Sequence, residues 1–175
     1  MATGLDAEYL HAKERALLML GVTNSQRMPS NRMIKEYIGR YTKAELGEEE
    51  HQRRLREMRQ IAFGIMTALE PYDPFLIGST RSGKIRLTSD VDIHAYCDDY
   101  EELKQALSDW GYEEAEEELV ENAKGSFVHL KWFEKNYPVE ITVYPWSWRD
   151  VLLYSSVTQR PMKRVDIRGV QALLR

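Results

Sequence analysis

Two aspartates separated by one hydrophobic residue are the most chemically suggestive feature of the sequence. Asp90 and Asp92 lie in the run TSDVDIHAY. Because strand side chains alternate between faces, both carboxylates are expected on one side, a few ångströms apart. Carboxylates so placed repel each other, and a hard divalent ion such as Mg²⁺ would relieve the repulsion. The pair therefore predicts a metal site.

A glycine-containing loop precedes the aspartates by about ten residues. An apolar run, FLI, ends at Gly78 and Ser79, where we expect a turn. Small Gly78 lets backbone N–H groups approach an anion, and Ser79 offers a hydroxyl. Arg81, Lys84 and Arg86 add positive charge nearby. The loop therefore predicts a site for nucleotide phosphates.

A third acid stands on a later strand. Glu140, in PVEITVY, faces away from the apolar Ile141 and Val143 if this segment is a strand. Beside the Asp90 strand it would complete a triad able to hold two Mg²⁺ ions roughly 3.5 to 4 Å apart for in-line displacement at phosphorus. One ion would lower the pKa of the acceptor, and the other would neutralise the leaving pyrophosphate, helped by Arg81 or Lys84.

A P-loop nearly fits the same residues. Gly78, Gly83 and Lys84 have its spacing, but Ile85 stands where a Ser or Thr hydroxyl should reach Mg²⁺. A strand, rather than the helix that a P-loop must open, is expected after Lys84. The P-loop interpretation is therefore rejected.

The combined motif resembles that of the DNA polymerase beta-like nucleotidyltransferase superfamily, especially its small standalone members. The residues that carry the resemblance are Gly78, Ser79, Arg81, Gly83, Ser89, Asp90, Val91 and Asp92. The resemblance covers about Asp73 to Tyr144, and it implies nucleotide-phosphate contact at Gly78 and Ser79 and metal binding at Asp90 and Asp92. It also implies a catalytic third carboxylate at Glu140, although aspartate is more usual there.

The predicted activity is Mg²⁺-dependent transfer of a nucleoside monophosphate from an NTP, ATP among them, to a hydroxyl, with release of pyrophosphate. The acceptor stays open between a small molecule, a protein side chain and an RNA end. Two alternatives belong to other classes. One is a catalytically silent, antitoxin-like partner protein with this fold, and the other is a nucleotide- or RNA-binding module.

Several other side chains have weaker signals. His94 shares the face of the two aspartates and is a candidate auxiliary group. Base stacking is one interpretation of three tryptophans and core packing the other: Trp132, Trp146 and Trp148. A basic C-terminal cluster has two interpretations, contact with a triphosphate or RNA and a solvated loop: Arg160, Lys163 and Arg164.

The elements that position these residues follow from hydrophobic periodicity. Three helices are expected in the first 70 residues: Leu5–Leu20, Ser30 or Asn31 to about Gly47, and Glu48–Leu69. The arginines of the third helix are expected to form a solvated face: Arg53, Arg54, Arg56 and Arg59. Five strands are expected at Phe75–Ile77, Val91–Tyr96, Tyr112–Val120, Ser126–Phe133 and Val139–Tyr144, with a turn at Glu134–Pro138. Further helices are expected at 100–110, Trp146–Tyr154 and Ile167–Leu174.

These elements predict an α+β fold. A small mixed sheet of four or five strands has helices on one face and the site on one edge. We expect this nucleotidyltransferase-like domain to comprise residues 71–175 and a helical extension to comprise residues 1–70.

Composition and charge narrow the function classes. The 175 residues are 43% hydrophobic and 30% charged, as in a globular protein. The net charge is +1 for residues 1–70, −9 for 71–145 and +4 for 146–175, which argues against non-specific binding to duplex DNA. No membrane span or secretory signal is apparent, and Cys97 is the single cysteine, so a cytoplasmic location is predicted. A homodimer is left open.

Overall fold

The computed structural model describes residues 4–21, 28–112, 115–122, 125–155 and 160–175. The α-helices are α1 (Gly4–Met19), α2 (Asn31–Leu46), α3 (Glu48–Ala68), α4 (Gly78–Ser82), α5 (Tyr100–Asp109) and α6 (Ile167–Leu173). The strands are β1 (Phe75–Leu76), β2 (Val91–Tyr96), β3 (Glu116–Asn122), β4 (Gly125–Glu134) and β5 (Tyr137–Tyr144). Two short 3₁₀ helices are η1 (Glu70–Tyr72) and η2 (Trp146–Trp148). None of the helices in these ranges has both the length and the apolar character needed to cross a membrane.

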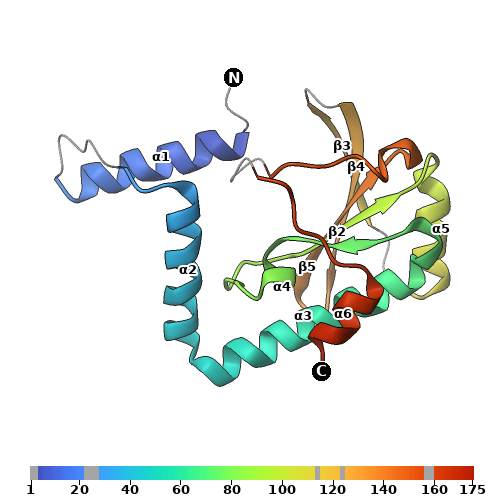
Figure 1. The fold of residues 1–175 in the computed structure, drawn as a ribbon, viewed down its shortest axis with the longest axis horizontal. Coiled ribbons are helices and arrows are strands. Elements are labelled where there is room, and N and C mark those ends of the chain that lie inside the picture. Colours follow the sequence, from blue (N-terminus) through green and yellow to red (C-terminus); the bar gives the residue numbers. More distant parts are fainter. Residues whose placement is uncertain (1–3, 22–27, 113–114, 123–124, 156–159) are drawn as a thin grey trace.

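The N-terminal helices begin and end at residues that the sequence supplies for this purpose. The Ser30 side chain accepts a hydrogen bond from the Met33 N–H at 3.2 Å and caps α2. Gly47, with φ 79°, makes the bend between α2 and α3. Helices α1 and α2 extend away from the sheet, whereas α3 runs beneath it (Figure 1).

The sheet has five strands in the order β1-β2-β5-β4-β3. Strands β2 and β5 run parallel, and every other neighbouring pair is antiparallel. The register aligns Asp92 with Glu140 and His94 with Thr142. Two strands that carry the predicted acids are therefore neighbours within the sheet.

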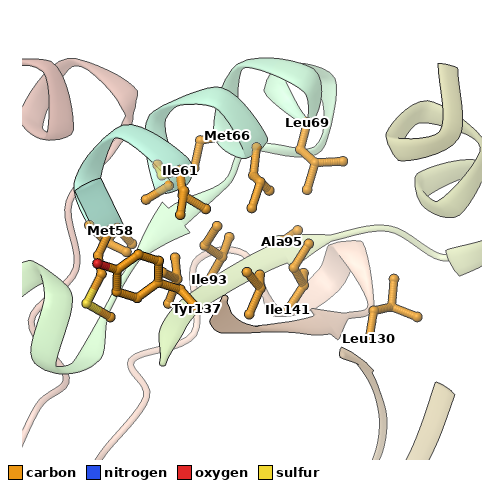
Figure 2. Close-up of a cluster of buried hydrophobic side chains, with 14 of the residues drawn as sticks. Met58, Ile61, Met66, Leu69, Ile93, Ala95, Leu130, Tyr137 and Ile141 are labelled. Atoms are coloured by element: carbon orange, nitrogen blue, oxygen red, sulfur yellow. The ribbon is translucent and has the colours of Figure 1, made fainter. Parts of the chain in front are cut away.

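The core lies between α3 and one face of the sheet. Met58, Ile61 and Met66 of α3 point toward Ile93 of β2 and Ile141 of β5, and all five are buried (Figure 2). Helix α5 adds buried leucines to the same cluster. Because alternate strand residues point to opposite faces, the acids lie on the face opposite α3 and α5. We call it the uncovered face because these core helices do not pack on it. The predicted α+β class and the one-sided helix layer are confirmed.

The turn between β4 and β5 is tighter than expected. Lys135 and Asn136 have φ values of 49° and 68° and form a two-residue hairpin loop, which matches the twist of the flanking strands. Pro138 is therefore inside β5, paired with Phe133, rather than in a turn at Glu134–Pro138.

Two other boundaries and one element differ from the prediction. The strand expected at Tyr112–Val120 begins at Glu116, because the Tyr112 N–H still bonds to Leu107 O at the end of α5. The helix expected at Trp146–Tyr154 stops after one 3₁₀ turn, because Leu153 O accepts the Met162 N–H from an extended segment. The bend at Gly78 and Ser79 is one turn of helix, α4.

The division at residue 70 stays a prediction. Helix α3 lies before that boundary and contributes six buried residues to the core beneath the sheet. Helix α2 is joined to the sheet domain by an ion pair between Glu36 and Lys84 at 3.8 Å.

Candidate functional site

The three acids come from two parallel neighbouring strands. Asp92 lies on β2 directly across from Glu140 on β5, and Asp90 immediately precedes β2. All three side chains are partly buried. Neither β2 nor β5 is an edge strand, so the site lies on the uncovered face of the sheet and not, as expected, on its edge. The reason is that β1 pairs with β2 and closes that side.

Gly78 brings the backbone against the carboxylate of Asp92. A Cβ atom at position 78 would lie 1.9 Å from Asp92 Oδ2, far inside van der Waals contact. The residue also has φ 67°, which favours glycine. No residue with a side chain therefore fits this position unless the carboxylate moves. This close approach ties the loop and the aspartate into one unit.

The electrostatics of the acids show that negative charge is crowded. Burial raises the pKa of Asp90 above its ordinary value, and the charge of Glu140 raises it further. A hydrogen bond between the side chains of Asp90 and Asp92 acts in the opposite direction, as does the charge of Arg86. Asp90 is therefore close to both of the other acids.

Glu140 is held by two cationic or hydrogen-bonding side chains of β4. His129 Nδ1 lies 3.1 Å from Glu140 Oε1, and Lys131 Nζ lies 3.4 Å from Glu140 Oε2. The hydrogen bond from His129 holds the pKa of Glu140 below its ordinary value, and Lys131 contributes in the same direction. Sequence reasoning missed both residues, because only the β4–β5 register brings them to Glu140.

The donor set suits a hard divalent cation in part. Oxygen ligands, crowded negative charge and a backbone cradle at Gly78 are all present. Within the described ranges, however, no three or more His, Cys, Asp or Glu side chains are gathered closely enough to hold a metal ion. Asp90 and Asp92 supply oxygen ligands of the kind such an ion prefers, whereas Glu140 would have to leave its β4 partners His129 and Lys131 to join them.

The loop between Gly78 and Asp90 is fixed by hydroxyl groups. Ser79 Oγ lies 3.0 Å from Ser89 Oγ, which also accepts the Arg86 N–H at 2.9 Å. Buried Thr80 donates its hydroxyl to Asp90 O at 2.9 Å. Thr80 thus positions the first aspartate, and its small polar side chain gave no signal in the sequence.

The two basic residues expected at the phosphates differ in placement. Arg81 is half-buried, its Nε has no hydrogen-bond partner in the part of the chain that the structure describes, and burial lowers the pKa of its guanidinium. Lys84 is 56% exposed and faces Glu36 of α2. Phosphate contact at Gly78, Ser79, Arg81 and Lys84 stays a prediction.

His94 lies further along the same face of β2. It is 4% exposed, and its ring packs edge-on against Tyr144 with centroids 4.9 Å apart. Burial lowers the pKa of His94 to about 4, helped by the charge of Arg164, so the ring is neutral at neutral pH. An auxiliary role for His94 stays a prediction.

The C-terminal cluster is divided. Arg160 and Lys163 are exposed, as a solvated segment requires. Arg164 instead donates to Tyr96 Oη at 2.8 Å and lies 4.2 Å over the ring of Phe75. Its guanidinium therefore packs beside β1 and β2, contrary to the solvated interpretation.

The tryptophans also differ from one another. Trp132 is buried in the core beneath the sheet, which excludes base stacking for it. Trp148 stacks on Tyr144 at 5.9 Å on the uncovered face, whereas Trp146 is 47% exposed.

Arg59, like Arg164, differs from the prediction that it is solvated. It donates to Thr80 O at 3.2 Å and to Leu173 O at 3.1 Å, so it joins α3, α4 and α6. Arg53 and Arg56 are exposed, as predicted. Arg54 is half-buried, donates to Leu87 O at 3.3 Å and lies 5.2 Å from the centre of the Tyr137 ring, so neither Arg54 nor Arg59 is part of a solvated face. The helical pattern of α3 could not indicate this role of Arg59, because both acceptors are backbone carbonyls distant in sequence.

Comparisons with known proteins give only distant similarity. No family model and no curated protein matches the sequence. Among solved structures, Cid1, studied as an RNA terminal uridylyl transferase, is 18% identical over 52% of this chain and 30% of its own, with a TM-score of 0.38. A cytoplasmic RNA terminal U-transferase is 15% identical over 65% of this chain and 34% of its own, with a TM-score of 0.37.

Cid1 in complex with the UTP analog UMPNPP is 16% identical over 65% of this chain and 37% of its own, with a TM-score of 0.37. This chain thus spans about a third of the length of these solved chains.

Proposed function

We propose that this protein is a Mg²⁺-dependent nucleotidyltransferase that moves a nucleoside monophosphate from an NTP to a hydroxyl acceptor. The observation that carries the proposal is the contact between the Gly78 backbone and the Asp92 carboxylate, with Asp90 beside them and Glu140 across from Asp92. A glycine loop pressed against paired carboxylates places a phosphate-binding backbone next to cation ligands.

In this mechanism, Asp90 and Asp92 would hold the cation that accompanies the triphosphate, and Glu140 would join them as the third ligand. The metal, when bound, would polarise the phosphoryl oxygens and lower the pKa of the acceptor hydroxyl. The Ser79 hydroxyl and nearby backbone N–H groups would orient the phosphates. Arg81 would add positive charge for the leaving pyrophosphate.

The acceptor stays open between a small molecule, a protein side chain and an RNA end. The antitoxin-like silent partner and the nucleotide- or RNA-binding module are the outcomes if the chemistry fails. Nucleotide binding that requires both a metal and the pair Asp90 and Asp92 would favour the enzyme over both alternatives. A module that only binds RNA has no need of these two carboxylates.

The test is incubation of the protein and Mg²⁺ with each α-labelled NTP and cell extract. We expect a labelled product and pyrophosphate with the parent protein, and neither with Asp92→Asn. The matched control is Asp109→Asn, which removes an exposed carboxylate at the end of α5. Equal labelling by Asp92→Asn and Asp109→Asn contradicts the proposal, whereas metal-independent NTP binding without labelled product indicates a binding module.

A homodimer and a cytoplasmic location stay predictions. Helix α2 carries an apolar stripe at every fourth residue, formed by Met33, Tyr37 and Tyr41, which are 60%, 73% and 57% exposed. A stripe of this kind suits contact with a second copy. Size-exclusion chromatography with light scattering measures the oligomeric state directly.

A further inference from the structure

A lysine on β4 lies between two carboxylates on the uncovered face of the sheet. Lys131 forms an ion pair with Glu118 of β3, and its Nζ also lies 3.4 Å from Glu140 Oε2. The strand register explains the arrangement, because Lys131 is directly opposite Glu140 and is paired with the strand that carries Glu118. One cation is therefore shared by an acid of the site and an acid outside it.

The two carboxylates differ in their surroundings. The Glu140 side chain is 28% exposed, whereas that of Glu118 is 57% exposed. An ion pair with Glu118 is thus largely in solvent, where it is worth little on its own. The contact with Glu140 is less exposed to solvent and lies near the charges of Asp90 and Asp92. A positive charge is screened less by water there and has a stronger effect.

A divalent cation at Glu140 would compete with Lys131 for the negative charge of that carboxylate. We propose that Lys131 is a built-in counter-cation of the third carboxylate: it pairs with Glu140 until a divalent cation takes that acid, and then passes wholly to Glu118. This inference rests on the proposed function, since it assigns Glu140 a metal. It makes Lys131 a positioning residue and Glu118 the acid that receives it.

The direct test is Mn²⁺ affinity, measured by calorimetry on the full chain without nucleotide. We expect Lys131→Met to tighten Mn²⁺ binding about tenfold or more, because a competing charge a few ångströms from the ligand is removed. The matched control is Lys104→Met. Lys104 is likewise shared between two glutamates, Glu101 and Glu117, but it belongs to α5 and lies on the helix side of the sheet.

A double-mutant cycle separates transfer to Glu118 from a general change of charge. We expect Glu118→Gln to weaken Mn²⁺ binding in the parent, because Lys131 then has only Glu140 as a partner. In the Lys131→Met background the same substitution should have no effect. Independent long-range electrostatics instead predicts the same effect of Glu118→Gln in both backgrounds.

Two results overturn the inference: Mn²⁺ affinity of Lys131→Met within about twofold of Lys104→Met, or an equal effect of Glu118→Gln in both backgrounds. A thermal melt of each variant confirms that it is folded, and Lys131→Gln serves as the substitute if Lys131→Met is not. The failure of the proposed function is a distinct result, namely Mn²⁺ binding by the parent that Asp92→Asn does not reduce.

Discussion

Replacing Gly78 by alanine tests how closely the loop and the aspartate are joined. The added Cβ would lie 1.9 Å from Asp92 Oδ2, so the two groups must separate by more than an ångström to reach ordinary contact. A displacement of about 1 Å at a catalytic group costs on the order of 100-fold in rate. We therefore expect Gly78→Ala to lower kcat/KM at least about 100-fold and to weaken Mn²⁺ binding.

Backbone strain is a separate effect of the same substitution. An alanine at φ 67° costs roughly 1–2 kcal/mol, which lowers the Tm of a chain of this size by about 2–8 °C. Gly83 supplies a matched control, because it has φ 76° but a Cβ there would meet Leu55 and Arg59 only at 3.5 and 3.6 Å. Gly83→Ala should therefore have a similar loss of Tm with nearly normal activity.

The assay compares both variants by thermal melting, Mn²⁺ titration and labelled-product formation. If Gly78→Ala keeps a kcat/KM within a few-fold of Gly83→Ala, the backbone contact does not position the Asp92 carboxylate and the reasoning is refuted.

Three further predictions concern stability. The folded state raises the pKa of Asp90, so the protein loses stability as the pH rises from the ordinary pKa of aspartate to this raised pKa. Asp90→Asn should therefore raise the Tm at pH 7, and the gain should vanish at pH values below the ordinary pKa of aspartate. The pKa of His94 falls to about 4, so the protein loses stability as the pH drops from about 6.5 to 4. In denaturant titrations His94→Phe should remove about 3 kcal/mol of this pH-dependent loss of stability, and an unchanged pH profile would count against a buried neutral ring. Arg59→Ala should lose about 2 kcal/mol because two hydrogen bonds from a charged donor disappear, and a Tm equal to that of Arg56→Ala would contradict this.

The fold could be predicted from the sequence where local signals agree. Ser30 before α2, Gly47 after it and the alternation in β2 each have a direct physical meaning, and the structure confirms these elements. A turn was predicted between β4 and β5, but its tight two-residue form at Lys135 and Asn136 was not, because positive φ at a lysine has no clear sequence signal. The end of the helix after Trp148 was not predicted, because the segment turns there and Leu153 and Ser155 bond to Met162 and Arg160 in place of helical partners.

The alternation of side chains along a strand predicted the face on which each acid lies, but not which strands are neighbours. Asp90 and Asp92 could be placed on one face from their spacing, and Glu140 from the pattern of its own strand. The parallel pairing of β2 with β5, which puts Glu140 opposite Asp92, is a tertiary fact. The same holds for His129 and Lys131, whose contacts with Glu140 follow from the β4–β5 register.

The central claim is that a divalent cation binds at the paired aspartates beside the glycine loop. Paramagnetic broadening by Mn²⁺ in backbone amide NMR spectra tests it most directly, because the effect reports the position of the ion. We predict broadening centred on the amides of Gly78, Val91 and Glu140, and its loss in Asp92→Asn. Broadening centred instead on an exposed acidic stretch such as Glu48–Glu50, and unchanged in that variant, would contradict the account.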